Sequence, residues 1–562
     1  MKKIIAFLLA IISVFSLVGC ADPGDGSGGG RPSEEFDPNK TQLYVLNYDG
    51  GYGTDWLYAV KARFEEDYAT ETFQPGKQGV QIMIDADKDG YYGTGLRDKM
   101  PVTTNEVFFS ESITFNDYVS LGYMMNIDDV VTSTNSDNKT IESKMSAEQK
   151  DSLKIGGSYY CIPHYASFAG INYDIDLFNS KKLFYAKDGV PSEPNFTGTV
   201  RYTNLKGQKS KGPDGEYGTY DDGLPATYDE FFALCGYMKN AMSITPFIWT
   251  GQYRTSYVSW ILAALASDYE GKEQMMLNFN FNGTAKNLAT VTSTGIQLDA
   301  QDKVINNSNG YELYRSAGRY YALDFLEKIL DNNYYHSSGF TDSSAITAQD
   351  TFLRSSYKNQ PIAMILEGIW WENEAEGTFE TMANRYGEKW AMKNRNFGIM
   401  PFPKATADKI GEKPTLIDNN YSYAFIRKDI STEKVDLAKL FLKYCYTDES
   451  LAEFTTIVGL PKALNYEMDE NTQWKSTYSQ KVWNLYDSAD KVYPFSQNPL
   501  YLGAQSAFVY YSTFRTSLET SAIDYLLRDK DSHTNAKDFF KGIIDTNTKA
   551  KWEQSYGRFF ED

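Results

Sequence analysis

Short apolar runs suited to β-strands alternate along this chain with segments whose apolar residues recur at helical spacing. Gln42–Tyr48, Val80–Asp85 and Asn105–Phe109 are strand-like, whereas Asp55–Tyr68 has apolar residues three and four positions apart. A strand-like run returns much later, at Tyr423–Ile426. Alternation of this kind predicts an α/β fold, in which helices cover the faces of a sheet.

The first 20 residues have the pattern of an export signal. Lys2 and Lys3 precede an apolar run that ends near Phe15 and is shorter than the roughly 20 residues of a membrane span. A small residue followed by Cys20 resembles the bacterial lipobox, so we expect residues 1–20 to be a lipoprotein signal and Cys20 to be lipidated. An ordinary signal peptide with an incidental cysteine is the alternative. The Gly- and Pro-rich residues 21–40 are predicted to be a flexible tether.

The composition excludes several classes of function. Asp and Glu number 74 against 55 Lys and Arg, a net charge of −19, so no basic face is expected for nucleic acid. With 3 His and 4 Cys in the chain, no zinc cluster is expected, and Cys161, Cys235 and Cys445 are predicted to be buried free thiols. We therefore expect no metal and no cofactor. The 43 Tyr, 33 Phe and 9 Trp suggest instead a surface that recognises its ligand by ring stacking.

Two Gly- and Asp-rich stretches, residues 85–95 and 203–225, are predicted to be inserted loops. The first begins with Asp85, Asp87 and Asp89, as a calcium loop does, but its twelfth position is Leu96 where a bidentate carboxylate is required. Turn chemistry is therefore favoured over calcium binding.

Several segments, taken in order, resemble the extracellular solute-binding proteins of family 1, which deliver sugars to ATP-binding-cassette importers, and are similar to maltodextrin-binding proteins. They are NEVFFSES at 105–112, Tyr160–Phe178, PATYDEF at 225–231, Ala363–Glu372, GIMPFP at 398–403 and Ala507–Leu518. Each motif is weak alone. Together they cover most of residues 41–550 in the expected order.

The resemblance implies a periplasmic-binding-protein-like α/β fold, with two lobes joined by crossing hinge strands and a ligand cleft between them. The N-terminal lobe would hold residues 41–164 and 414–468, and the C-terminal lobe residues 165–413 and 469–562. The late segment Gln505–Arg528 is predicted to be helical.

The same resemblance implies a non-enzymatic, monomeric protein that is lipid-anchored to the outer face of the bacterial cytoplasmic membrane. It would capture a carbohydrate, oligosaccharides above all, and deliver it to the permease subunits of an ABC transporter. A secreted cell-surface glycoside hydrolase and a glycan-binding lipoprotein that needs no permease are the alternatives.

A sugar offers hydroxyls and an apolar face of C–H groups, so its site needs aromatic rings beside carboxylates and amides. Loops that follow strands supply such residues, because α/β sheets bind ligands at the carboxyl ends of their strands. In the first part of the chain the candidates are Asp49, Tyr52, Trp56, Ser110, Glu111 and Tyr165. Further along they are Trp249, Arg254, Glu367, Trp370, Trp371, Asn420, Tyr421 and Tyr510.

For several candidates a structural role competes. Trp56 fits the core face of its helix, and Tyr510 fits core packing equally well. Trp370 and Trp371 point in different directions, so at least one is expected in the core. The resemblance gives the stacking role to Trp370.

Overall fold

The computed structural model describes residues 35–560 except 191–201, 342, 420, 505–514, 518, 519 and 529–534. The predicted signal with Cys20, most of the predicted tether, Asn420 and Tyr510 lie outside the described residues.

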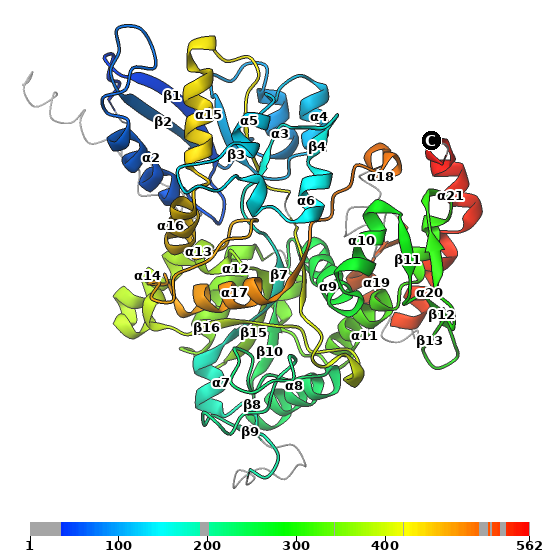
Figure 1. Ribbon diagram of the computed structural model, residues 1–562. Helices are drawn as coiled ribbons and strands as arrows, with labels where there is room; N and C mark the ends of the chain where they lie inside the picture. The colour runs from blue at the N-terminus through cyan, green and yellow to red at the C-terminus, as the bar shows by residue number, and fades with distance from the viewer. Residues whose placement is uncertain are drawn as a thin grey trace, which may run out of the picture.

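The first lobe, at the top of Figure 1, is built on a mixed sheet that in the described part has five strands in the order β2-β1-β3-β18-β6. Their bounds are β1 Thr41–Tyr48, β2 Val80–Asp87, β3 Val107–Ser110, β6 Ile162–Pro163 and β18 Tyr423–Ile426. Strand β1 runs parallel to β2 and β3, and β18 enters antiparallel to β3. Because β18 comes from far along the chain, two separate stretches of sequence build this lobe.

Helix α2 shows why these residues form a covered sheet. It spans Asp55–Asp67 and buries Trp56, Leu57, Val60 and Phe64, which recur at helical spacing. Phe64 packs edge-on against Phe441 of α15 (Val435–Tyr444), so the late helix closes over the early one. The other helices of this lobe are α3 Gly93–Lys99, α4 Phe115–Ser120, α5 Asp128–Thr132, α6 Ala147–Ser152 and α16 Asp448–Val458.

The second lobe, below the first in Figure 1, has a sheet with the order β10-β15-β7-β16 in the described part. Its strands are β7 Ala169–Asp174, β10 Thr245–Ile248, β15 Ile362–Gly368 and β16 Phe397–Met400. Every residue of β7 and β15 is buried, as expected for strands covered on both faces. The helices around it are α7 Ile175–Lys181, α8 Tyr228–Met242, α9 Arg254–Glu270, α10 Lys272–Asn280, α11 Ala317–Asp331, α12 Ala345–Ser355, α13 Trp371–Glu374, α14 Glu376–Tyr386 and α17 Thr477–Ser488.

The C-terminal helices lie beside α10 and α11, on the flank of the second lobe (Figure 1). They are α18 Pro499–Gly503, α19 Ala522–Arg528, α20 Ala536–Thr546 and α21 Lys549–Tyr556. Of the helix predicted over Gln505–Arg528, the part at Ala522–Arg528 is confirmed as α19, whereas Arg515–Ser517 (β20) and Thr520–Ser521 (β21) form paired strands, so the prediction is wrong there.

Small antiparallel or parallel strand pairs complete the described fold. They are β4 Lys154–Ile155 with β5 Ser158–Tyr159, β8 Phe184–Tyr185 with β9 Tyr202–Thr203, β11 Gly283–Ala285 with β14 Lys303–Ile305, β12 Ala289–Val291 with β13 Ile296–Leu298, and β17 Thr415–Ile417 with β19 Asp490–Val492.

Three segments of the described chain run between the lobes: β6 to β7, β17 to β18, and α16 to α17. They meet at His164. Its backbone N–H donates to Ser422 O at 2.9 Å, and its backbone carbonyl accepts from Ala463 N at 3.2 Å. A further bond from Ala166 N to Pro461 O, 3.0 Å, joins the first and third segments. The predicted lobe boundaries at 164, 413 and 468 stay a prediction.

Candidate functional site

The carboxyl ends of β1 and β3 in the first lobe face the end of β15 in the second, at the hinge. Tyr52, after β1, stacks on Tyr165 with ring centroids 3.6 Å apart and planes 9° from parallel. The Tyr52 hydroxyl donates to Ala166 O at 2.5 Å, and the Tyr165 hydroxyl donates to the carboxylate of Glu111, which follows β3. Two strand-end loops and the first connection are thus held in one unit.

Glu111 has an unusual electrostatic environment. Burial raises the pKa of its carboxyl to about 7, and the nearby Glu374 carboxyl of the second lobe adds to the rise, whereas the bond from Tyr165 opposes it. Tyr48, the last residue of β1, is also close, since Glu111 contributes after burial to a raised pKa of its phenol. Carboxyl groups of both lobes therefore face each other across the junction.

Glu367 lies near the end of β15 and is fully buried. Its Oε1 accepts from Gly368 N at 3.0 Å, and the side chains of Gln349 and Tyr257 lie within hydrogen-bonding reach of the carboxyl. Burial, followed by the charge of Glu374, raises the pKa of Glu367 well above its ordinary value. The raised pKa favours the neutral form of Glu367, which can both donate and accept a hydrogen bond.

Gln349 of α12 connects this acid to its neighbours. Its Nε2 donates to Glu374 Oε2 at 2.9 Å, and its Oε1 has no partner among the described residues. Buried polar atoms are usually paired, because an unpaired one costs about 1–3 kcal/mol. A neutral Glu367 carboxyl can donate to the Gln349 amide oxygen, so these two buried side chains form one polar group at the lobe junction.

Trp370 lies where the second lobe touches the first. A Cβ on Gly51 would lie 2.7 Å from Trp370 Cβ, so the loop after β1 approaches the indole only because residue 51 is glycine. The amide nitrogen of Asn373, in the next turn, donates to Gly51 O and Val458 O, both at 3.0 Å. Both acceptors belong to the first lobe.

A row of rings leads from Trp370 along α9. Trp260 meets Trp370 edge-on at 5.9 Å, Tyr257 lies 4.5 Å from Trp260, and Tyr253 lies 6.5 Å from Tyr257. Tyr253 is half exposed, whereas Trp370 is 6% exposed, so the row runs from the surface to the lobe junction.

We call the residues at this junction the interlobe cluster: Tyr48, Tyr52, Glu111, Tyr165, Tyr257, Gln349, Glu367, Trp370 and Glu374. Beside it lies a cavity of about 180 Å³ lined from both lobes, by Asp49–Asp55, Lys88, Ile346, Asn373, Glu374, Glu376, Ile457, Val458 and Lys475. Of the predicted site residues, Asp49, Tyr52, Glu111, Tyr165, Glu367 and Trp370 thus come together here.

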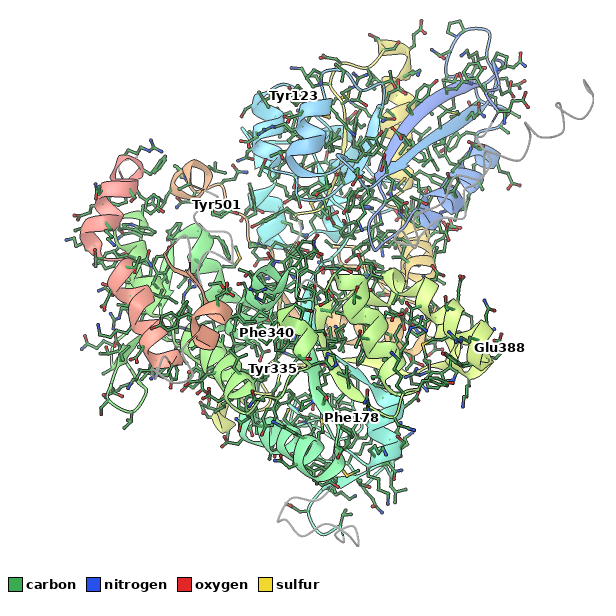
Figure 2. All side chains as sticks on the ribbon, turned by 180° about the vertical axis from the view of Figure 1, so that it is seen from behind. Tyr123, Phe178, Tyr335, Phe340, Glu388 and Tyr501 are labelled. Carbon is green, nitrogen blue, oxygen red and sulfur yellow. The ribbon has the colours of Figure 1, made fainter. Side chains whose placement is uncertain are left out.

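Three predicted tryptophans lie in hydrophobic cores. Trp56, on the buried face of α2, is 1% exposed. Trp249 and Trp371 are fully buried, and Trp249 Nε1 donates to Gly339 O at 3.0 Å. Trp249 packs against Tyr335 and Phe340, which Figure 2 shows in the second lobe. None of the three leaves a ring face for a ligand.

Three other predicted residues make bonds elsewhere. Arg254 pairs with Asp524 of α19 at 3.3 Å, and Ser110 donates to Tyr91 O at 2.5 Å. Tyr421 has a positive φ of 47°, and its N–H donates to Asp418 at 3.3 Å beside the hinge. It lies near Tyr165, with which it lines a small cavity.

The predicted site residues did not include Tyr48, Tyr257, Gln349 or Glu374. Tyr48 directly precedes Asp49, and Glu374 lies four residues after Trp370, so spacing alone could have suggested these two. Gln349 lies on α12, and no pattern in the sequence around it predicts that this helix reaches the lobe junction.

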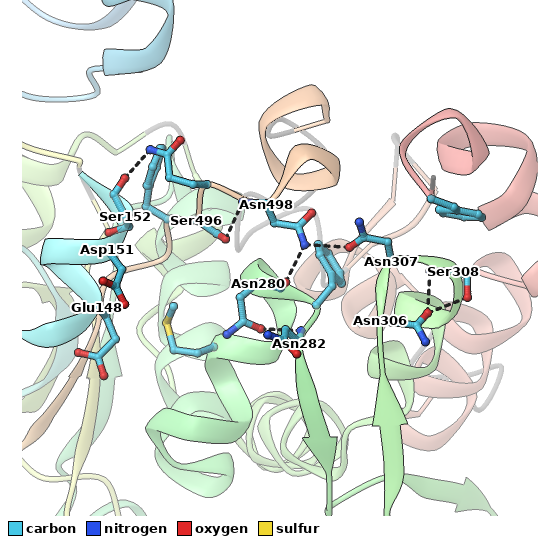
Figure 3. Close-up of a pocket in the computed structure, with 15 residues that line it drawn as sticks. Glu148, Asp151, Ser152, Asn280, Asn282, Asn306, Asn307, Ser308, Ser496 and Asn498 are labelled. Carbon is cyan, nitrogen blue, oxygen red and sulfur yellow. Dashed lines mark hydrogen bonds between the residues drawn. The ribbon is translucent and has the colours of Figure 1, made fainter. Parts of the chain in front are cut away.

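A larger cavity of about 770 Å³ lies between α6 and α10 (Figure 3). Glu148, Asp151 and Ser152 line one side and a group of asparagines the other. The Asn498 amide donates to Asn280 O and Asn307 Oδ1, both at 2.8 Å, so these asparagines hold loops together. The interlobe cluster is therefore the better candidate site.

The described residues contain no group of three or more His, Cys, Asp or Glu placed to hold a metal ion. In the first Asp-rich loop, Asp85 accepts from Tyr91 and Asn105, both at 2.8 Å, and Asp87 accepts from Asp89 N at 3.0 Å. Cys161, Cys235 and Cys445 are free and buried, as predicted. No helix within the described ranges is long and apolar enough to cross a membrane.

The fold matches solved structures of solute-binding proteins over nearly the whole chain. The solute-binding protein RafE in complex with raffinose is 13% identical, covers 90% of this chain and 99% of its own, and has a TM-score of 0.51. An ABC-transporter binding protein from Bifidobacterium animalis subsp. lactis in complex with mannobiose is 12% identical, with 92% and 95% covered and a TM-score of 0.52. The GacH receptor of Streptomyces glaucescens, solved unliganded and with acarbose, is 12% identical, with 92% and 99% covered and a TM-score of 0.50.

No curated protein matches this sequence. The profile of the family described as bacterial extracellular solute-binding protein matches residues 101–479, which is more than half of the chain. The two-lobed α/β fold predicted from the sequence is confirmed by the solved structures. The chain belongs to the family of bacterial extracellular solute-binding proteins.

Proposed function

We propose that this protein binds a carbohydrate, with oligosaccharides favoured, at the interlobe cluster. The observation that carries the proposal is the meeting of rings and carboxyl groups from both lobes at one junction, with Tyr52, Tyr165 and Trp370 beside Glu111 and Glu367. Rings pack against the C–H face of a sugar, and carboxyl groups bond its hydroxyls. RafE, GacH and the mannobiose-binding protein were each solved with a sugar or sugar-like ligand, which supports this choice.

The raised pKa of Glu367 favours its neutral form, which suits a neutral, hydroxyl-rich ligand. A buried ionised carboxylate would attract a cation, whereas a neutral acid donates one hydrogen bond and accepts others without a charge to compensate. Gln349, with an amide that both donates and accepts, offers the same versatility at the neighbouring position.

Closure of the lobes links ligand binding to recognition by the permease. A ligand that contacts both lobes stabilises the closed form by its higher affinity for that form. The hinge segments that meet at His164 can rotate as one unit while each sheet keeps its core. The closed form is then the state that a permease of an ABC transporter senses.

The remaining parts of the proposal concern place and partners. The protein acts outside the cytoplasm as a monomer without catalytic activity, anchored to the outer face of the membrane by lipid on Cys20, and passes its sugar to permease subunits. The predicted lipobox, the predicted tether and the family membership support this arrangement.

A panel of mono- and oligosaccharides tests the proposal by differential scanning fluorimetry, followed by isothermal titration calorimetry on each hit. We expect at least one sugar to raise the unfolding temperature and to bind with a micromolar or lower Kd. The same sugars are assayed in parallel for release of reducing ends. Release would indicate a glycoside hydrolase, and a complete lack of binding to neutral sugars would contradict the proposal.

A further inference from the structure

Lys462 has a rare environment for a lysine. Its side chain is fully buried, and among the described residues it forms no ion pair with a carboxylate. Instead, four rings surround the ammonium nitrogen, with centroids at 4.5 Å for Trp56, 4.5 Å for Tyr446, 4.6 Å for Phe454 and 5.6 Å for Phe109. We call these four rings the lysine cage.

The only hydrogen bond that the structure gives this ammonium goes to His164, with Nζ 3.1 Å from Nδ1. Because an ammonium group only donates, His164 Nδ1 is the acceptor, which places the ring proton on Nε2. Burial, and then Lys462, holds the pKa of His164 well below its usual value, so the imidazole is neutral.

The other titratable groups that face Lys462 are neutral as well. Burial raises the pKa of the Cys445 thiol to about 12 and that of the Tyr446 phenol above its ordinary value. The cage therefore contains one titrating group, because burial lowers the pKa of Lys462 itself to about 7. An apolar side chain of similar length would fill this space without the cost of desolvating a charge, so packing alone does not explain a lysine.

The cage is made from the segments that carry the first-lobe half of the interlobe cluster. Trp56 lies four residues after Tyr52, Phe109 lies two residues before Glu111, and His164 directly precedes Tyr165. On the backbone, Lys462 pairs with Tyr165 in an antiparallel bridge. The ammonium group of Lys462 thus contacts three segments, and each of them also carries a residue of the interlobe cluster within four positions of the contact.

We propose that Lys462 is a positioning residue for the ligand site: its ammonium group draws Trp56, Phe109 and His164 together and so fixes Tyr52, Glu111 and Tyr165. The proposal rests on the proposed function of the interlobe cluster. Ring faces attract a cation most strongly when it is removed from water, as it is here. The Lys462 side chain, which contacts the four rings and His164, holds the three segments in register.

The first test is Lys462→Met, which leaves an unbranched side chain of similar length and removes the charge. We expect faster hydrogen exchange at residues 49–56, 107–112 and 162–168, an unfolding free energy that is unchanged or higher, and about a tenfold weaker sugar affinity. Lys404→Met is the matched control, since Lys404 is equally buried but paired with Asp268 at 2.9 Å. The control leaves an unpaired buried carboxylate, so it should lower stability without faster exchange at those three segments.

A second measurement uses the unaltered protein and needs neither a variant nor a sugar. Exchange rates of the three segments, corrected for the intrinsic effect of pH, are compared at pH 6 and pH 8. Folded Lys462 loses its proton near pH 7, whereas a lysine exposed by opening of the cage keeps its proton up to about pH 10.5. Opening that exposes Lys462 therefore costs more free energy at pH 8, so we expect several-fold slower corrected exchange in the three segments at pH 8 than at pH 6, and no such change around Lys404. Equal corrected rates at the two pH values, or Lys462→Met with unchanged exchange, would overturn the positioning role.

The two proposals fail in different ways. If no sugar binds but the exchange pattern appears, the ligand assignment is wrong and the positioning role stands. If a sugar binds equally well to the unaltered protein and to Lys462→Met, with equal exchange in both, the positioning role is wrong and the ligand assignment stands.

Discussion

Tyr165 is the residue that joins the two strand-end loops of the first lobe. It contacts Tyr52 with its ring face and Glu111 with its hydroxyl, so one side chain fixes both the aromatic and the acidic part of the interlobe cluster. Its position in the first hinge segment means that movement of the hinge also moves the cluster.

Trp370→Ala should weaken sugar binding ten- to a hundredfold. Burial of a large ring contributes about 1.5–3 kcal/mol, and each 1.4 kcal/mol changes the affinity about tenfold. Calorimetric titration with the best sugar of the panel measures the effect.

The matched control is Trp371→Ala, which alters the next residue in the core. Trp371 packs edge-on against Phe397 and Tyr478. Its loss should cost about 3–5 kcal/mol of unfolding free energy. A Trp370→Ala protein that binds the sugar as tightly as the unaltered protein would refute the platform role.

Glu111→Gln should change how stability depends on pH. The folded carboxyl titrates at about 7 instead of its ordinary 4.5. Between these values the folded protein holds a proton that the unfolded chain has released, so the contribution of Glu111 to the unfolding free energy falls as the pH rises from 4.5 to 7. Urea unfolding from pH 4.5 to 8 should show this fall in the unaltered protein and a flatter curve in the variant.

Exposed Glu376 provides the comparison for that experiment. Glu376→Gln should leave the shape of the pH curve as it is. If Glu111→Gln and the unaltered protein have parallel curves over this range, the carboxyl titrates at its ordinary value and the electrostatic description of the site is incorrect.

At the scale of elements, α13 joins the lobes although it has only one turn. It begins directly after Trp370, and its Asn373 reaches two carbonyl groups of the first lobe, one in the loop after β1 and one at the end of α16. Lys475, in the third hinge connection, donates to Asn373 Oδ1 at 2.9 Å and orients the amide.

Asn373→Ala should shift the unliganded protein toward an open form. Each lost hydrogen bond contributes about 0.5–1.5 kcal/mol, which is enough to change a two-state population severalfold. Distances between spin labels on the two lobes should lengthen, and the sugar Kd should rise. Asn394→Ala is the control, because that amide bonds Glu388 O within the second lobe; equal distance distributions for both variants would show that Asn373 does not hold the lobes together.

At the scale of the whole molecule, each sheet is completed by a strand from a distant part of the sequence. Strand β18 inserts between β3 and β6, and β16 pairs with β7. The chain therefore crosses between the lobes repeatedly, and the crossing segments bond one another rather than acting as separate linkers. This arrangement lets two stable bodies move about a compact hinge.

Cys20→Ala should release the protein from the membrane fraction or leave its signal uncleaved. The expectation follows from the lipobox-like sequence, since several acyl chains on one cysteine anchor a protein stably. Cell fractionation and immunoblotting measure it, with Cys161→Ala as a control that removes a buried thiol. A Cys20→Ala protein that stays in the membrane fraction at its mature size would contradict lipid anchoring.

Strand and helix periodicity in the sequence determined much of the fold. The strand-like run Tyr423–Ile426 forms β18 and is buried in every residue, as is β16 at Phe397–Met400. Helix α8 spans Tyr228–Met242 around a regular buried face. Such patterns are local, because a strand or helix shows its buried face in the order of its own residues.

Tertiary structure alone decided which aromatic residues reach the lobe junction. Trp370 and Trp371 are adjacent and chemically identical, yet the turn after β15 directs one to the lobe junction and the other into the core. Burial raises the pKa of Glu111, and Glu374 of the other lobe adds to the rise. The lysine cage contains rings from α2, β3 and α16. Burial and charge proximity arise between segments far apart in the chain, so the sequence determined the lobes and their loops, and the packing of one lobe against the other determined the site.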